Sequence, residues 1–299
     1  MWKVNEDGFM ECVKDFRVKD FIVRAGTIGA KLPEKYNIST ESWIEASCEI
    51  GENVYIECGC HVGACTQIGA GTSIHSHVVI GKFCCISSDV EIEPMCQLAD
   101  GVRIRSNVKL GHGCQIGYRS LISAYSRLGS RCRTGKESTI GSGCTIEYNC
   151  EIGNFVAIHE DCHLCDNVKI ADRAKVGFGT GIRPSINIPR EVEVPAQQWI
   201  EPDNFMVFVN QGTRCRPVFM MFDSRASSKN AGDVMVTVGC QDCITFTKFL
   251  SRIKNAIGTT DKSALMYRQN IPLFKAARKR IILNRARSVT KRILVHLGF

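Results

Sequence analysis

The 299-residue chain is poor in proline and has no long apolar run. It contains eight prolines, and between Lys35 and Arg183 the only one is Pro94. No stretch approaches the 18 consecutive apolar residues of a transmembrane helix, which excludes a membrane span. The segment MWKVNEDGFMECVKDF at the start carries acidic residues where a signal peptide needs an apolar core. We therefore expect a cytoplasmic protein.

Acidic residues are scarce in the last third of the chain. Residues 205–299 hold 17 Lys and Arg against four Asp and Glu, whereas residues 1–204 hold 21 against 26. An acidic body with a basic C-terminal part indicates that the second part meets an anion. The alternative is a set of basic side chains on a solvated helix face.

The sequence repeats every six residues. Steps of six from Leu32 to Ile200 reach 29 positions, of which 28 are aliphatic and the exception is Thr134. A small side chain follows four residues after the aliphatic one. The position just after the aliphatic residue is often glycine, which we expect to relieve the sterics of a tight corner. Period six fits neither a helix nor a two-sided strand and predicts short strands that turn a corner every six residues.

The 17 cysteines fit the same repeat. Without an export signal the compartment is expected to be reducing, which favours free thiols over disulfides. Nine cysteines occupy the small inward position, where a buried thiol packs as a small hydrophobe. These are Cys48, Cys60, Cys84, Cys96, Cys114, Cys132, Cys144, Cys150 and Cys162.

The pattern from Leu32 to Ile200 resembles the hexapeptide-repeat family, whose members fold as left-handed parallel β-helices of triangular section. The resemblance implies about nine coils of 18 residues, a prism roughly 45 Å long. We therefore predict a mainly β protein with three parts. These are an N-terminal cap (1–31), a left-handed β-helix of hexapeptide repeats (32–204) and a small basic α+β domain (205–299). We expect Trp43 and Trp199 to cover the open ends of the prism.

The C-terminal part is predicted to contain strands followed by helices. The expected strands are 206–210, 217–222 and 233–239, and the expected helices are 244–258 and 263–294, the second interrupted at Pro272. This order is reminiscent of a C-terminal module on some phage-encoded hexapeptide proteins.

Two histidines occupy slots that resemble catalytic ones. The best-known hexapeptide proteins are homotrimeric acyltransferases, in which a histidine at a cleft between prisms acts as general base. His112 in LGHGCQIGY resembles the base of the lipid A N-acyltransferases and sugar N-acetyltransferases, although Gly113 stands where those have Asn or Asp. His77 in IHSHVVIGKF is similar to the catalytic histidine of the UDP-N-acetylglucosamine O-acyltransferases. An imidazole pKa near 6.5 suits this task. The alternative for both is a surface histidine at a turn.

No metal site is expected. The segment from His159 to His163 matches H-E-x-x-H, but that zinc motif works only on a helix. Here Ile158 and Leu164 are in phase with the six-residue repeat, which places the segment on the prism. The C-x-x-C pair at Cys240 lacks a second pair at metal-ligand spacing.

Basic residues dominate the chain after Pro272, with no acidic residue among them. In acyltransferases of this family a basic C-terminal helical region can receive the acidic acyl carrier protein, and the same charge could hold the phosphates of a nucleotide or nucleic acid. The expected anion-binding residues are Lys275, Arg278, Lys279, Arg280, Arg285, Arg287, Lys291 and Arg292.

Two functions follow, and the sequence leaves open whether the protein is an enzyme. The favoured one is a homotrimeric acyltransferase that moves an acyl group from acyl-CoA or acyl carrier protein to an amino or hydroxyl group of a sugar nucleotide. It uses His112 or His77 as the base and no tightly bound cofactor. The alternative is a non-catalytic trimer that binds and sequesters anionic nucleotides or nucleic acid, a role for which the phage-like C-terminal module suggests a phage-encoded protein. The lack of a long loop within the prism and Gly113 favour this alternative.

Overall fold

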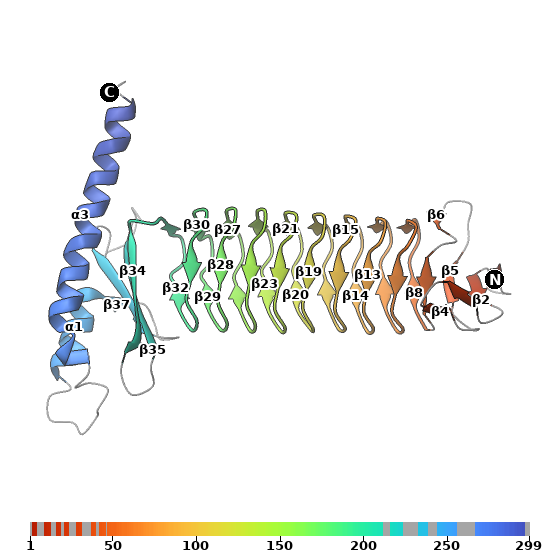
Figure 1. Ribbon diagram of the computed structural model, residues 1–299, viewed down its shortest axis with the longest axis horizontal. Helices are drawn as coiled ribbons and strands as arrows, with labels where there is room; N and C mark the ends of the chain where they lie inside the picture. Colours follow the sequence, from red (N-terminus) through yellow and green to blue (C-terminus); the bar gives the residue numbers. More distant parts are fainter. Residues whose placement is uncertain are drawn as a thin grey trace.

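The structure is a computed structural model in which a long three-sided prism lies between a small N-terminal part and a C-terminal sheet with helices (Figure 1). It describes residues 37–39, 42–45, 47–211, 216–223, 233–238, 244–255 and 267–296, together with five strands before residue 32. Those five form one sheet in the order β1-β2-β5 and one hairpin, β3-β4. Their bounds are β1 Trp2–Val4, β2 Phe9–Cys12, β3 Phe16–Val18, β4 Phe21–Val23 and β5 Ile28–Lys31.

The prism is the predicted left-handed parallel β-helix. Its walls are three parallel sheets, here called sheets 1, 2 and 3, of nine, nine and ten two-residue strands. Sheet 1 contains β7 (Trp43–Ile44), β10 (His61–Val62), β13 (Val79–Ile80), β16 (Gln97–Leu98), β19 (Gln115–Ile116), β22 (Arg133–Thr134), β25 (Glu151–Ile152), β28 (Lys169–Ile170) and β31 (Asn187–Ile188). Sheet 2 contains β8 (Glu49–Ile50), β11 (Gln67–Ile68), β14 (Cys85–Ile86), β17 (Arg103–Ile104), β20 (Leu121–Ile122), β23 (Thr139–Ile140), β26 (Ala157–Ile158), β29 (Lys175–Val176) and β32 (Glu193–Val194).

Sheet 3 contains β6 (Asn37–Ile38), β9 (Tyr55–Ile56), β12 (Ser73–Ile74), β15 (Glu91–Ile92), β18 (Lys109–Leu110), β21 (Arg127–Leu128), β24 (Thr145–Ile146), β27 (His163–Leu164), β30 (Gly181–Ile182) and β33 (Trp199–Ile200). Each strand from β6 to β30 pairs in register with the strand 18 residues later, as Ile74 does with Ile92. Three hexads therefore make one coil, as the sequence predicts.

The corners have a repeating backbone geometry that corrects the expected role of glycine. Every sixth residue from Ser47 to Gln197 has a positive φ, and most of these residues are not glycine. The frequent glycines lie two positions earlier and are needed for another reason. A Cβ on Gly111 would stand 2.7 Å from the Ser130 nitrogen of the next coil. Glycine there allows close stacking of coils and does not supply a left-handed conformation.

The prism interior is filled by the aliphatic and small residues of the repeat, which form one continuous core. All nine inward cysteines are buried and free. Each donates its thiol hydrogen to the carbonyl oxygen fifteen residues later, in the next coil. Thr134, the exception among the aliphatic residues, is also buried, and its Oγ1 accepts the Gly117 N–H at 3.1 Å.

A four-stranded antiparallel sheet covers the C-terminal end of the prism. Its strands are β34 (Phe205–Gln211), β35 (Arg216–Phe222), β36 (Val234–Val238) and β37 (Ile244–Thr245). Phe219, Met221 and Met235 pack into the prism core, whereas Val218 and Met220 face the other way, toward the helices. Successive side chains of β35 point to opposite faces of the sheet, so one face packs on the prism and the other on the helices.

This arrangement corrects the expectation for Trp199. That side chain is 41% exposed and stacks on the outside of the prism under the Arg183 guanidinium, at 4.6 Å from its carbon to the ring centre. The open coil is closed by the C-terminal sheet instead. Trp43 is buried in β7, in the first described coil of sheet 1.

The helices lie against the outer face of the C-terminal sheet (Figure 1). They are α1 (Phe246–Asn255) and α3 (Ile271–His296). The predicted interruption is a turn at Asn270, and Pro272 lies in the first turn of α3, where the missing N–H costs no helical bond. Among the described residues, no helix combines the length and apolar character needed to cross a membrane.

Candidate functional site

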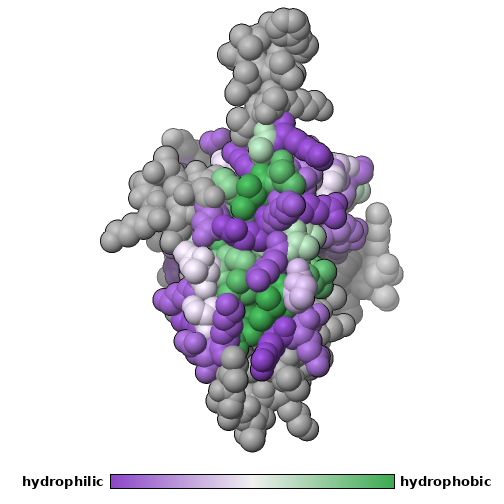
Figure 2. Space-filling model, turned by 90° about the vertical axis from the view of Figure 1, so that its left-hand side faces the viewer, coloured by the Kyte–Doolittle hydropathy of each residue, from purple (hydrophilic) through white to green (hydrophobic). Residues whose placement is uncertain are grey.

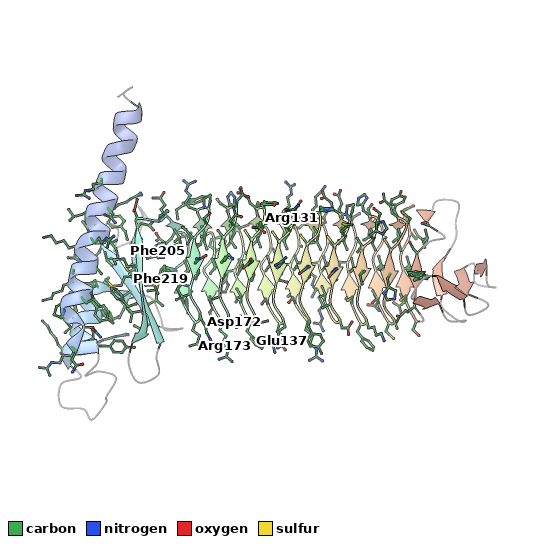
Figure 3. The ribbon with its side chains drawn as sticks, in the orientation of Figure 1. Arg131, Glu137, Asp172, Arg173, Phe205 and Phe219 are labelled. Carbon is green, nitrogen blue, oxygen red and sulfur yellow. The ribbon has the colours of Figure 1, made fainter. Side chains whose placement is uncertain are left out.

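The corners that follow sheet 3 form one straight edge of the prism, called edge 3 here. Its outward residues are 57–59, 75–77, 93–95, 111–113, 129–131, 147–149, 165–167 and 183–185, one group per coil. Side chains stand out from the coils in rows, and Arg131 marks this edge in Figure 3. Because the coils stack in register, residues 18 apart in sequence become direct neighbours along the edge.

The structure brings His77 and His112 to the same edge. His77 follows β12 and His112 follows β18, with only β15 between these strands in sheet 3. At about 4.8 Å per strand, the two corners are roughly 10 Å apart. Both side chains are exposed. The predicted candidates therefore lie two coils apart on one surface.

The rings of these two histidines have no hydrogen-bond partner within the described residues. The backbone N–H of His112 donates to Oε2 of Glu93 at 2.8 Å, so that carboxylate holds the backbone of His112 and not its ring. The His77 ring lies over Gly59, where any Cβ would collide with it. Gly113 has φ +67°, and a Cβ there would meet nothing within 4 Å.

A third histidine on edge 3 does have a carboxylate partner. Nδ1 of His75 lies 3.1 Å from Oε1 of Glu57, in the preceding coil, and Oε2 of Glu57 accepts the Ser76 N–H at 2.8 Å. The hydrogen bond from His75 is the main reason that the pKa of Glu57 lies below its ordinary value. A carboxylate that holds one ring nitrogen fixes the tautomer and orientation of an imidazole. Sequence reasoning missed this pair, although the 18-residue spacing of Glu57 and His75 could have shown it.

The predicted anion-binding residues separate into two groups. Arg278 and Arg285 are already paired: the first with Asp233 at 3.0 Å and the second with Glu201 at 2.8 Å, which ties α3 to the sheet and to the prism. Four are exposed on α3, namely Lys275, Lys279, Arg280 and Arg287. The side chains of Lys291 and Arg292 and the Cys240–Cys243 pair lie outside the described residues.

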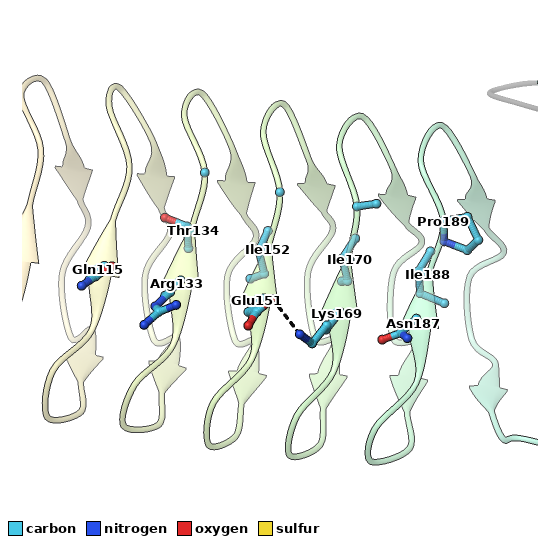
Figure 4. A pocket seen from close by; sticks show the side chains of 13 residues that line it. Gln115, Arg133, Thr134, Glu151, Ile152, Lys169, Ile170, Asn187, Ile188 and Pro189 are labelled. Carbon is cyan, nitrogen blue, oxygen red and sulfur yellow. Dashed lines mark ion pairs between the residues drawn. The ribbon is translucent and has the colours of Figure 1, made fainter.

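Two grooves lie away from edge 3. One, of about 700 Å³, runs along sheet 1 and is lined by Arg133, Glu151 and Lys169 (Figure 4). Lys169 Nζ lies 3.0 Å from Glu151 Oε2, so these charges offset each other. The other, of about 540 Å³, lies between α1 and α3 and includes Lys254 and Lys275.

Residues 47–82 match the family model described as bacterial transferase hexapeptide (six repeats). The prism is built of hexapeptide repeats. No curated protein matches the chain by sequence.

The hexapeptide prism is also similar to solved structures. UDP-N-acetylglucosamine acyltransferase from Campylobacter jejuni is 19% identical, with 50% of this chain and 68% of that one covered, at a TM-score of 0.38. The enzyme of the same name from Francisella novicida is 16% identical over 82% of this chain and 89% of its own, at 0.38. A mutant of perosamine N-acetyltransferase from Caulobacter crescentus, in complex with CoA and GDP-perosamine, is 17% identical over 44% and 52%, at 0.21.

Proposed function

We propose that the protein is an acyltransferase whose active site lies on edge 3. The observation that carries this proposal is the Glu57–His75 pair, with Nδ1 and Oε1 3.1 Å apart, on the same edge as the exposed His77 and His112. General-base catalysis needs an imidazole of fixed tautomer with a second nitrogen directed to the substrate. The acyltransferases named above and the hexapeptide repeats at 47–82 support acyl transfer as the reaction class.

The reaction transfers an acyl group from the thioester of acyl-CoA or acyl carrier protein to a hydroxyl or amino group of a sugar nucleotide. The acceptor oxygen or nitrogen attacks the thioester carbonyl carbon as a histidine ring nitrogen removes its proton. The carbon–sulfur bond then breaks, and the proton passes to the leaving thiolate. The products are an ester or amide and a free thiol, so no oxidant or tightly bound cofactor is needed.

We assign the base to edge 3 and rank its histidines by their contacts. His75 comes first, because Glu57 can stabilise the imidazolium that forms in the transition state. His77 and His112 are exposed two coils apart and serve as bases or as acceptor-binding groups. In a homotrimer, a neighbouring prism beside edge 3 would complete the cleft around these residues.

The test is acyl transfer measured by mass spectrometry of the acceptor, using acyl-CoAs of several chain lengths and a panel of UDP-sugars with free hydroxyl or amino groups. We expect His75→Gln to lower the rate by about 10²-fold or more, the usual contribution of a general base. His77→Ala and His112→Ala report on the other two histidines. His61→Gln is the matched control, since His61 is also paired with a glutamate, Glu45, but lies away from edge 3.

Full activity in the His75, His77 and His112 variants would overturn the proposed site. If the wild-type protein acylated none of the acceptors in the panel, the proposed function would be overturned. Sedimentation or light scattering tests the proposed trimer, for which a mass near three times 33.2 kDa is expected.

The exposed cations of α3 favour a second candidate function. Figure 2 shows hydrophilic side chains around a hydrophobic patch on the C-terminal face, which includes the surface of the helices. Lys275, Lys279 and Arg280 have no ion-pair partner within the described residues. They would bind an acidic carrier protein in the enzyme, or nucleotide or nucleic-acid phosphates in a non-catalytic protein. Binding that weakens steeply with salt and is lost in a Lys275, Lys279 and Arg280 triple alanine variant supports this role.

A further inference from the structure

Three side chains with metal-binding chemistry converge farther along edge 3, where His163 of β27 lies beside two corner residues. The three are the carboxylate of Glu147, the imidazole of His163 and the thiol of Cys165, whose ligand atoms all lie within 4.8 Å of one another. Nε2 of His163 is 2.7 Å from Oε1 of Glu147. Glu147 lies two coils beyond Gly111, so the cluster is separate from the proposed catalytic histidines.

The coil geometry brings these residues together. β24 and β27 pair in register, with Ile146 opposite Leu164, so the residues that follow them, Glu147 and Cys165, are stacked in adjacent coils. His163 and Cys165 flank the inward-facing Leu164 and therefore both point out of the prism. An oxygen, a nitrogen and a sulfur ligand atom are thus held together by the rigid backbone of two neighbouring coils.

Glu147 differs from the other glutamates in equivalent corners. Glu45, Glu57 and Glu93 each use one carboxylate oxygen to accept a backbone N–H from the next coil, nineteen residues later. Within the described residues the carboxylate of Glu147 accepts no such bond, and its only hydrogen-bond partner there is the His163 ring. One carboxylate oxygen of Glu147 is therefore available to a ligand.

Cys165 also lacks a hydrogen bond that its counterparts, the nine inward cysteines, make. Each of those donates to a carbonyl oxygen of the next coil. Cys165 is only 7% exposed, and its thiol has no hydrogen-bond acceptor in the part of the chain that the structure describes. The thiol is therefore not committed to a hydrogen bond there and is available to a ligand.

An aromatic contact holds His163 in place. Its ring meets that of Trp199 edge to face, with the centres 5.8 Å apart. The guanidinium of Arg183 lies over the other ring of this pair, Trp199, and its Nε is 3.9 Å from Glu201 Oε1. Glu201 also pairs with Arg285 at 2.8 Å, so it offsets the charge of Arg183 only in part.

We propose that Glu147, His163 and Cys165 bind a zinc-type divalent cation. Zinc takes carboxylate oxygen, imidazole nitrogen and thiolate sulfur at about 2.0–2.3 Å in tetrahedral geometry, which places the ligand atoms roughly 3.3–3.6 Å apart. Oε1 of Glu147 and Nε2 of His163, 2.7 Å apart here, separate as the ion enters. The thiol proton leaves to solvent, so thiolate and carboxylate neutralise the two charges of the ion. Three protein ligands leave a fourth position for water, the arrangement of catalytic zinc sites.

The chain contains its own comparison site. Glu45 and His61 have the same sequence spacing as Glu147 and His163, and their Oε1 and Nε2 atoms are 3.1 Å apart. The position that corresponds to Cys165 is Gly63, which offers no side-chain ligand. The proposal therefore predicts metal binding at the first cluster and none at the second.

The test titrates the chelator-treated, reduced full-length chain with Co²⁺ and then with Zn²⁺. We expect one equivalent of Co²⁺ to produce a thiolate-to-cobalt charge-transfer band, which Zn²⁺ abolishes by displacement. Cys165→Ser should remove the band, and His163→Gln and Glu147→Gln should weaken Co²⁺ binding at least tenfold. Two matched controls, Cys58→Ser at an exposed thiol and His61→Gln at the comparison site, should change neither the band nor the affinity.

Three results would overturn the proposal: no band in the wild type, a band that survives in Cys165→Ser, or an equal loss in the two controls. Circular dichroism identifies a variant that fails to fold. In that event the Glu147→Gln variant decides the question, because it changes only one half-exposed oxygen to nitrogen. Unchanged Co²⁺ affinity in the Glu147→Gln protein refutes the site. This inference does not depend on acyl transfer.

Discussion

His75 and Glu57 are 18 residues apart in sequence, yet Nδ1 of the first lies 3.1 Å from Oε1 of the second across adjacent coils. The hydrogen bond stabilises the carboxylate, and the Ser76 N–H adds a smaller contribution, so the pKa of Glu57 lies below its ordinary value. The pair is the only one among the described histidines of edge 3 that joins a corner histidine to the same corner position of the preceding coil.

We predict that His75→Ala raises the pKa of Glu57. Because the folded pKa is depressed, this group stabilises the folded state above its unfolded pKa, and the stabilisation is lost as the pH falls through the folded pKa. Carbon-detected NMR titration of the Glu57 carboxyl should show a higher midpoint in the variant. An identical midpoint in both proteins would show that His75 does not hold this carboxylate.

Two glycines of one corner should respond differently to substitution. Gly111→Ala forces a Cβ to within 2.7 Å of the Ser130 nitrogen, and we expect a loss of about 1–3 kcal/mol in unfolding free energy. Gly113→Asn places its side chain in open space, and Asn tolerates φ +67°, so the change should stay within about 0.5 kcal/mol. Chemical denaturation measures both, and equal losses would contradict the stacking explanation.

Replacing a buried aliphatic residue at mid-prism should lower the free energy of unfolding far more than replacing its exposed neighbour. Ile104 is completely buried and Arg103, beside it in β17, is exposed. We expect Ile104→Ala to cost about 2–5 kcal/mol and Arg103→Ala less than about 0.5 kcal/mol. Thermal unfolding followed by far-ultraviolet circular dichroism distinguishes them. Similar shifts in the two variants would argue against a continuous interior core.

Inward thiols should resist alkylation. Burial raises the pKa of Cys48, Cys60 and Cys84 to about 11, so few thiolates exist at pH 8, and the packed coils exclude the reagent. Cys58 and Cys65 are exposed and should react first with iodoacetamide. Peptide mass spectrometry of a time course provides the rates. Labelling of Cys60 as fast as Cys58 in folded protein would refute this packing.

The sequence predicts most of the fold because one spacing recurs without a slip. The six-residue repeat sets the positions of the strands, the corners and the inward-facing residues. Because three repeats make one coil, each strand pairs with the strand 18 residues away. The closure of the prism could not be predicted in this way. Phe219, Met221 and Met235 occupy strands whose partner surface, the last coil, is apparent only when the C-terminal sheet is folded against it.

The candidate site was predictable in part. His77 and His112 were singled out by their place in the hexad, and the structure puts both on edge 3. Glu57–His75 and the Glu147, His163 and Cys165 cluster were missed because each glutamate precedes its partners by 16 or 18 residues, which is not a metal-ligand or catalytic spacing in helices or loops. Their proximity arises from the length of one coil, which stacks outward residues 18 apart as it stacks inward ones.

The in-register stacking of coils also means that distances along edge 3 come in fixed increments. Inserting or deleting a complete 18-residue coil between Gly113 and Glu147 would move the zinc-type cluster by about 4.8 Å relative to the histidines while leaving the internal geometry of each group intact. Evolution or an engineer can therefore adjust the separation of two chemistries on this protein stepwise, without redesigning either one.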